Sequence, residues 1–207
     1  MTLTGGPGES GPWNNQEFVM SSAIEMSPAT TRALRITGWS FAAGLLALPA
    51  IAMQFTDEVN WSGSDFVFAA IMFGTVGGLL ELAARASSNL AYRVAVAAAV
   101  VCGLLQIWIN LAVGIIGNED NSANWTYFAV VFMAAAGGIV AFGDPRSLVR
   151  ALVAAAGAQF LFSVLHALNG TPTPIIDGFF ILVWLVAAKL FARASKERQF
   201  AEPVAQS

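Results

Sequence analysis

The feature that most constrains this chain is a series of apolar segments, each long enough to cross a lipid bilayer as a helix. Crossing about 30 Å of hydrocarbon takes about 20 helical residues. Segments of this kind follow one another with short breaks near residues 34–55, 65–84, 91–117, 125–142, 147–168 and 174–192. The sequence therefore predicts an all-α integral membrane protein, a compact bundle of six transmembrane helices arranged as three hairpins.

The composition agrees with this fold class and excludes several others. Hydrophobic residues make up 57% of the chain and charged residues only 11%, whereas soluble domains carry roughly 25% charged residues. A net charge of -3 with ten Lys and Arg argues against a nucleic-acid partner. One Cys and one His exclude an internal disulfide framework and a Cys-based zinc site, and no cofactor is expected.

Charged residues outside the apolar segments predict the orientation of the bundle. In this arrangement all ten Lys and Arg fall on one side of the membrane, and such residues near span ends stay cytoplasmic. Both termini are therefore predicted to be cytoplasmic, with a disordered tail over residues 1–27, the transmembrane domain over 28–195 and a second tail over 196–207. An Ala- and Gly-rich composition that favours Arg over Lys is typical of GC-rich bacteria, which predicts a bacterial inner membrane.

Two stripes of polar side chains within the apolar segments form the main candidate site. The third segment carries Gln106 and Asn110, and the fifth carries Gln159, Ser163 and His166 on one helix face. Polar groups in a bilayer are costly and often mark function. Either these side chains hydrogen-bond across a contact between the third and fifth helices, or they line a polar vestibule that opens to the external side.

Paired acids at two predicted external turns form a second candidate site. Asp57 and Glu58 follow the first segment, and Glu119 and Asp120 follow the third. Carboxylates of this kind attract hard cations, but their spacing matches no recognised calcium loop, so no metal is assigned. The alternative is that these acids are solvated turn residues. Asp177, in the first turn of the last segment, is interpreted as complementing the helix dipole.

Proline positions predict several helix boundaries and one hinge. Asp144 before Pro145 and Thr173 before Pro174 are typical N-caps, each followed by proline at the first helical position. Pro49 falls inside the first segment, where it removes one helical hydrogen bond. We therefore expect a kink near the middle of the membrane, which serves either as a hinge beside the vestibule or for packing alone.

Small residues predict close contacts between helices. Gly74 and Gly78 form a GxxxG pattern in the second segment, and Gly137 and Gly138 lie together in the fourth. Small side chains let helix backbones approach closely in lipid. The expected partners are the lipid bilayer and, through these small-residue faces, a second copy of the chain or another membrane protein.

An enzymatic role is not expected. Ser163 and His166, three residues apart on one helix, are the available pairing of a nucleophile with a base. The chain contains no GxSxG, HExxH, Walker A or dinucleotide-binding pattern. Residues spaced in this way on one helix are more often packing neighbours than a catalytic pair.

One segment resembles a known group of sequences. Residues 108–124, which read WINLAVGIIGNEDNSAN, resemble a segment found in uncharacterised small multi-span bacterial membrane proteins. The resemblance covers the end of the third segment and the turn that follows it. It implies a multi-span membrane fold, and it transfers no activity.

These features lead to two functional hypotheses. The first is a transport-type or ion- and pH-responsive inner-membrane protein, whose external vestibule combines the polar stripes with the acidic turns. The alternative is a non-catalytic structural or accessory subunit of a membrane complex, which would dock partners through its small-residue faces. We favour the first hypothesis because the polar stripes and the acidic turns converge on one side of the membrane.

Overall fold

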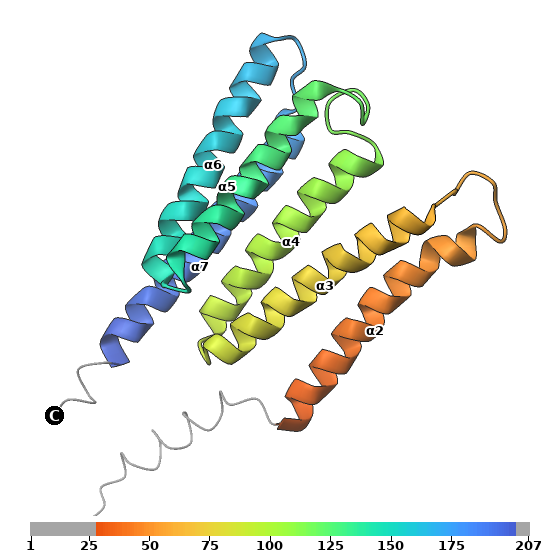
Figure 1. Cartoon of the computed structure of the whole chain (residues 1–207). Coiled ribbons are helices and arrows are strands. Elements are labelled where there is room, and N and C mark those ends of the chain that lie inside the picture. Colours follow the sequence, from red (N-terminus) through yellow and green to blue (C-terminus); the bar gives the residue numbers. More distant parts are fainter. Residues whose placement is uncertain (1–27, 202–207) are drawn as a thin grey trace, which may run out of the picture. The chain divides into compact units, whose positions relative to one another are not determined.

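Helices account for almost all of the chain that the structure describes. The computed structural model describes residues 28–201; the predicted tail over residues 1–27 lies outside this range. The α-helices are α2 (Pro28–Ala52), α3 (Gly63–Ala86), α4 (Leu90–Ala112), α5 (Trp125–Ala141), α6 (Pro145–Leu168) and α7 (Pro174–Ala201), with a short 3-10 helix η1 (Ser122–Asn124) before α5 (Figure 1). No strand occurs within residues 28–201.

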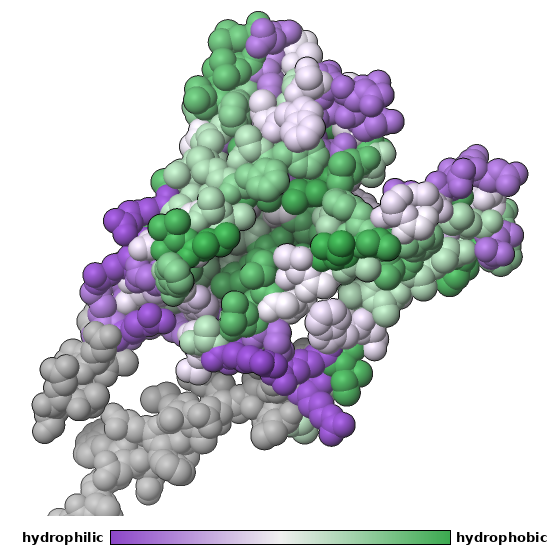
Figure 2. All heavy atoms as spheres, in the orientation of Figure 1, coloured by the Kyte–Doolittle hydropathy of each residue, from purple (hydrophilic) through white to green (hydrophobic). Residues whose placement is uncertain are grey.

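Each of the six α-helices between residues 28 and 201 is long and apolar enough to cross a membrane. Their outer faces agree with this: Ile139 and Val140 on α5 expose 73% and 77% of their surface, which would be unfavourable in water. Figure 2 shows hydrophilic residues at the two ends of the α4–α7 segment and hydrophobic residues between them. The prediction of six helices long and apolar enough to cross a membrane is confirmed, and it is compatible with a multi-pass membrane protein.

The described residues divide into two units, residues 28–63 and 64–201. The first unit contains α2, which ends at Ala52, so Pro49 lies in the last helical turn. The carbonyl of Pro49 accepts a hydrogen bond from the backbone N–H of Met53 at 2.9 Å. The sequence placed Pro49 near the middle of the first span, whereas it lies in the last turn of α2 because the helix stops before the apolar run does; its role as a hinge stays a prediction.

In the second unit, α4 to α7 form a four-helix bundle. Each of these helices packs against two others: α4 and α6 both contact α5 and α7 (Figure 1). Aromatic residues fill much of the core, and Tyr127, Phe180, Trp184 and Phe191 expose 2% of their surface or less. Helix α3 lies beside α4, and the ring of Phe73 stacks on Trp108 with centroids 5.8 Å apart.

Small residues permit close packing between α5 and α6, but the face of α3 that carries Gly74 and Gly78 makes no such contact in the part of the chain that the structure describes. A Cβ atom built on Gly137 would lie 2.5 Å from the Cβ of Ala151, so these two helices approach as closely as glycine allows. A Cβ atom built on Gly74 or Gly78 meets no atom within 4 Å among the described residues. The GxxxG pattern of α3 therefore makes no close helix contact within residues 28–201.

Polar contacts define several helix ends. Asp144 caps α6 as predicted, because its carboxylate accepts the backbone N–H of Ser147 at 2.8 Å. The hydroxyl of Ser147 also donates to this carboxylate, and these hydrogen bonds lower the pKa of Asp144. On α3, Arg85 pairs with Glu81 at 2.8 Å, the spacing expected of an ion pair one helical turn apart.

Two predicted boundaries need correction. Helix α4 ends at Ala112, five residues before the predicted end at 117, because the chain turns there and Gly114 and Gly117 adopt positive φ angles of 71° and 70°. Helix α7 continues to Ala201, into the predicted tail. Its last turns carry an ion pair between Arg193 and Glu197 at 2.8 Å, which supports a helix beyond the apolar segment.

Candidate polar site in the four-helix bundle

Buried polar side chains gather in one half of the α4–α7 bundle. This half contains the end of α4, the beginning of α5, the end of α6 and the beginning of α7. The buried polar residues among those described are Gln106, Asn110, Asn124, Gln159, His166 and Asp177. Four of the five residues of the predicted stripes are in this set, together with Asp177, which the sequence had assigned to the helix dipole alone.

Gln106, Gln159 and Asp177 form a continuous chain of hydrogen bonds between three helices. The Nε2 of Gln106 on α4 donates to the Oε1 of Gln159 on α6 at 2.6 Å. The Nε2 of Gln159 donates in turn to the Oδ1 of Asp177 on α7 at 2.8 Å. All three side chains are buried, with 0–1% of their surface exposed. The structure thus brings the third and fifth predicted spans together at these two glutamines.

A second chain of hydrogen bonds reaches the other oxygen of Asp177. The hydroxyl of Thr173 donates to Oδ2 at 2.8 Å, and the Tyr127 hydroxyl on α5 lies 3.0 Å from the Thr173 hydroxyl oxygen. Because Thr173 uses its single hydrogen on Asp177, Tyr127 is the donor in this second bond. Hydrogen bonds from α4, α5 and α6 therefore all lead to the carboxylate of Asp177.

The groups around Asp177 carry no formal positive charge that pairs with it. Its hydrogen-bond donors, Gln159 and Thr173, are neutral, and α4 contributes the neutral side chains Gln106 and Asn110. The other titratable groups near it are Tyr127 of α5 and His166 of α6. No Lys or Arg in residues 28–201 forms an ion pair with Asp177. A buried carboxylate with no cationic partner is unusual among membrane helices and marks a candidate functional group.

His166 lies beside this network. Its Nε2 is 3.1 Å from the hydroxyl oxygen of Thr126, which donates its own hydrogen to the carbonyl of Ala123 at 2.7 Å. Nε2 must therefore carry a hydrogen and donate it to Thr126, and in the neutral ring Nδ1 then has a free lone pair. Nδ1 is buried and has no hydrogen-bond partner among the described residues. The ring packs against Tyr127, with centroids 5.6 Å apart.

Three further buried polar atoms in the bundle have no partner among the described residues. They are the Oε1 of Gln106, the Oδ1 of Asn110 and the Nε1 of Trp184. The Nδ2 of Asn110 is used locally, because it donates to the backbone carbonyl of Gln106 at 2.8 Å. Unpaired groups of this kind are rare in folded proteins. Two acceptors on α4 and one donor on α7 thus remain available in the bundle interior.

The predicted site residues do not all join the network. Ser163 is half-buried and makes no hydrogen bond among the described residues, and His166 bonds to Thr126 instead. Ser163 and His166 therefore do not form a hydrogen-bonded pair. Gln106 and Gln159 are fully buried and bonded to each other, so they differ from the expectation that they line an open vestibule.

The acidic turns are exposed. Asp57 and Glu58 lie in the first unit, and Glu119 and Asp120 lie in the second, on the loop between α4 and η1. Within residues 28–201, no group of three or more His, Cys, Asp or Glu side chains is placed to hold a metal ion. The role of these acids in attracting cations stays a prediction.

Asn124 organises the loop that carries the second acidic pair. Its Oδ1 accepts the backbone N–H groups of Ile115 and Ile116 at 3.1 and 2.8 Å. Its Nδ2 donates to the carbonyls of Ile116 and Asn118 at 3.3 and 2.7 Å. The side chain is 2% exposed. Asn124 is therefore a structural residue that holds the turn between α4 and α5.

The sequence reasoning missed Asp177, Thr173 and Tyr127 as parts of one network. A signal was present, because Thr173 and Asp177 are four residues apart and Trp184 lies two further turns along the same face. An acid, a hydroxyl and an aromatic residue on one face of an apolar helix predict a buried polar contact.

No protein-family model, no curated protein and no solved structure matches this chain.

Proposed function

We propose that this chain is a transport-type or pH-responsive protein of a bacterial inner membrane, in which Asp177 is the group that takes up a proton. The observation that carries the proposal is the environment of its carboxylate. Asp177 is 1% exposed, accepts hydrogen bonds from the neutral Gln159 and Thr173, and has no ion-pair partner in residues 28–201. Ionisable residues buried among membrane helices are typical of proton pathways.

Protonation of Asp177 would change the contacts that hold the bundle together. The ionised carboxylate only accepts hydrogen bonds, whereas the protonated acid must also donate one. The new O–H needs an acceptor, and turning it toward Thr173 or Gln159 would reverse one of the hydrogen bonds that these residues now donate. These donors connect Asp177 to α6 and α4 on one side and to α5 on the other. Proton uptake is thereby coupled to the packing of all four helices.

His166 supplies a second proton acceptor in the same half of the bundle. Its Nδ1 lone pair is unused among the described residues, and its ring contacts Tyr127, which is hydrogen-bonded to Thr173. Histidine gains a proton more readily than any other neutral side chain near physiological pH. We therefore include His166 in the proton-responsive site, with Asp177 as its acidic member.

The proposed orientation places this site toward the external side. The Lys and Arg residues lie at the opposite ends of the spans, which favours cytoplasmic termini. Glu119 and Asp120 then lie on an external loop above the bundle, where their charges would raise the local concentration of cations. This arrangement retains the two elements of the sequence hypothesis but moves the proton-binding group to Asp177.

The first test measures the thermal stability of the full-length protein in detergent between pH 5 and pH 8. Asp177→Asn keeps the shape of the side chain but cannot ionise, so under this proposal its stability profile should differ from that of wild type. His166→Gln should remove a separate part. The matched control is Asp57→Asn/Glu58→Gln, which neutralises two exposed acids outside the four-helix bundle and should leave the profile unchanged. Identical profiles for wild type and Asp177→Asn would overturn the proposal.

The second test separates transport from pH sensing. The protein is reconstituted into liposomes that contain a pH-sensitive dye, and proton influx is recorded under an imposed membrane potential. A transport role predicts influx that is lost in Asp177→Asn and retained in the control. A pH-dependent stability without influx would support a pH-responsive protein that does not transport protons itself. Absence of both effects would contradict the proposal and favour the alternative of a structural or accessory subunit.

A further inference from the structure

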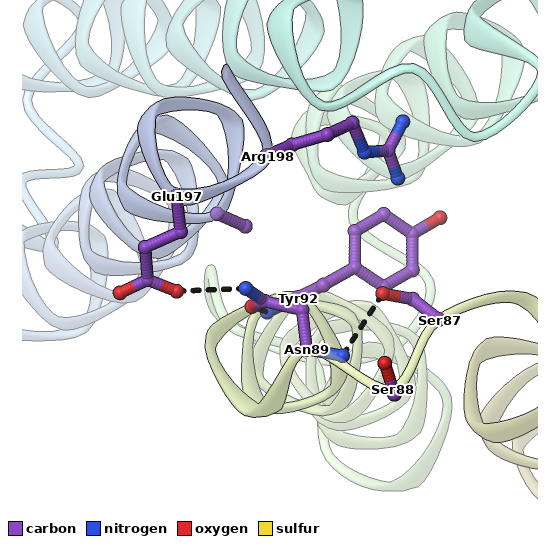
Figure 3. A pocket seen from close by; sticks show the side chains of 7 residues that line it. Ser87, Ser88, Asn89, Tyr92, Glu197 and Arg198 are labelled. Carbon is purple, nitrogen blue, oxygen red and sulfur yellow. Dashed lines mark hydrogen bonds between the residues drawn. The ribbon is translucent and has the colours of Figure 1, made fainter. Parts of the chain in front are cut away.

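A cavity of about 230 Å³ lies at the opposite end of the four-helix bundle from Asp177. It is formed by the turn between α3 and α4, the beginning of α4 and the last turns of α7. The residues labelled in Figure 3 line it: Ser87, Ser88, Asn89, Tyr92, Glu197 and Arg198. The cavity is separate from the proton-responsive site and uses none of its residues.

The charges in this cavity leave one cation without a counter-ion. The Oε1 of Glu197 accepts from the Nε of Arg193 at 2.8 Å, and its Oε2 accepts from the Nδ2 of Asn89 at 2.7 Å. Arg198 forms no ion pair or hydrogen bond among residues 28–201. Figure 3 shows Glu197 extending toward Asn89 and Arg198 extending toward Tyr92. The negative charge of Glu197 is thus paired with Arg193, which does not line the cavity, whereas the positive charge of Arg198 has no ion-pair partner within residues 28–201.

Several neutral polar groups of the lining have hydrogen-bond donors that are not in use. Ser87 accepts the backbone N–H of Asn89 at 3.1 Å, which leaves its own O–H unused. Ser88 and Tyr92 form no side-chain hydrogen bond within the described residues. The Oδ1 of Asn89 is occupied by the backbone N–H of Tyr92 at 2.9 Å. Free O–H groups beside an unpaired guanidinium are the partners that an oxyanion requires.

We propose that this cavity binds the phosphate group of an anionic membrane lipid. Arg198 would provide the charged, multiply hydrogen-bonded contact that guanidinium groups make with phosphate, and the hydroxyls of Ser87, Ser88 and Tyr92 would complete it. The cavity volume of about 230 Å³ exceeds the space that one phosphate group needs. Basic cavities between membrane helices are typical binding sites for anionic lipid headgroups.

The position of the cavity favours a lipid over free phosphate. It lies at the ends of α4 and α7, where the basic residues of the chain gather and the helices leave the apolar region. Leu90, next to Asn89 at the start of α4, exposes 63% of its surface and provides an apolar contact for the acyl chains beside the headgroup. A phosphate held here would keep its lipid tails along the outside of the bundle.

The test measures thermal unfolding of the full-length protein in a neutral detergent while short-chain phosphatidylglycerol is added. Ligands that bind only the folded protein raise its unfolding temperature in a saturable way. The expected result is a saturable rise for wild type and an apparent affinity about tenfold weaker for Arg198→Gln, as loss of a charge-assisted contact implies. The matched control is Lys196→Gln, which removes an exposed cation of the same helix end that does not line the cavity.

Additional arms identify the source of the phosphate and protect the test against misfolding. Short-chain phosphatidylcholine should give a smaller rise, because its positive charge opposes Arg198. Inorganic phosphate should give almost none, and a rise as large as that from phosphatidylglycerol would overturn the assignment to a lipid. Equal weakening in Arg198→Gln and Lys196→Gln would overturn the site itself, since it would indicate a general charge effect. Ser88→Ala, a milder change on an exposed turn, should weaken binding less than Arg198→Gln; an unchanged affinity in both variants would also contradict the proposal.

Discussion

The side-chain amide of Gln159 donates to the carboxylate of Asp177 at 2.8 Å, and both side chains are almost completely buried. Gln159 lies more than two helical turns from the end of α6, whereas Asp177 is in the first turn of α7. Helix α7 therefore begins deeper in the bundle than α6 ends (Figure 1). This offset turns an acid at a helix start into a buried group.

Replacing Gln159 with leucine should destabilise the protein. The change leaves the Nε2 of Gln106 and the Oδ1 of Asp177 without the partners they have now. A buried polar group that loses its partner costs about 1–3 kcal/mol, so we expect a loss of this order in the free energy of unfolding, measured in mixed detergent micelles. Ser163→Ala, on the same helix without a hydrogen bond, is the control and should change stability by less than about 0.5 kcal/mol.

Tyr127→Phe should weaken the second chain of hydrogen bonds but preserve packing. The variant keeps the ring that contacts His166 and removes only the hydroxyl that donates to Thr173. We expect a loss of about 1 kcal/mol in the free energy of unfolding. A double-mutant cycle with Thr173→Val tests the direct link, because two residues in one network give non-additive effects. Additive losses would be inconsistent with the hydrogen bond.

Asn124→Ala should loosen the loop between α4 and α5. It removes hydrogen bonds to the backbone of Ile115, Ile116 and Asn118. We expect faster amide hydrogen exchange over residues 113–121 with the helices largely unchanged. Asn118→Ala is the matched control, since Asn118 contributes its backbone carbonyl to the contact and not its side chain. Similar exchange in both variants would contradict the role of Asn124.

Asp144→Ala should reduce stability in a way that depends on pH. Hydrogen bonds from Ser147 lower the pKa of Asp144 in the folded protein. A carboxyl whose pKa falls on folding stabilises the protein above its unfolded pKa, and this contribution is lost as the pH drops through the folded pKa. The difference in unfolding temperature between wild type and Asp144→Ala should therefore be full at neutral pH and shrink in acid. Asp144→Asn, which keeps a cap acceptor, should differ from wild type less at neutral pH.

Gly137→Ala should disrupt the contact between α5 and α6. Its new Cβ would lie 2.5 Å from the Cβ of Ala151, so the helices would have to separate. Overpacking of this kind costs about 1–3 kcal/mol. Gly138→Ala, whose Cβ would meet nothing within 4 Å among the described residues, is the control. Adding Ala151→Gly to Gly137→Ala should restore much of the loss, and a failure of this rescue would argue against the contact.

Sequence reasoning predicted the helices better than the site because span length and helix caps depend on local chemistry. The six apolar segments and the Asp144 cap follow from residues close together in the chain. The joining of Gln106 and Gln159 was one of two interpretations of their spacing. The spacing of Thr173, Asp177 and Trp184 indicates a polar contact, but it does not give how deeply α7 begins relative to α6, which determines that Asp177 is fully buried.

The same distinction explains the small-residue and proline predictions. Both pairs of glycines, Gly74 with Gly78 and Gly137 with Gly138, could permit a close contact between helices. Only the position of the neighbouring helix decides which glycine makes such a contact, and here it is Gly137. Pro49 lies near the helix end because α2 stops at Ala52, within an apolar run that hydropathy alone would continue. In each case the missing information was the position of another segment.

Helix α7 carries Asp177 in its first turn and Arg198 near its end, about 32 Å apart at 1.5 Å per residue. Between them, Phe180, Trp184 and Phe191 hold it against the other helices of the bundle. This single helix therefore connects the two sites. If a lipid phosphate bound near Arg198 changes the proton affinity of Asp177, then thermodynamic reciprocity applies. Protonation of Asp177 must change the affinity of the cavity for that phosphate by the same factor.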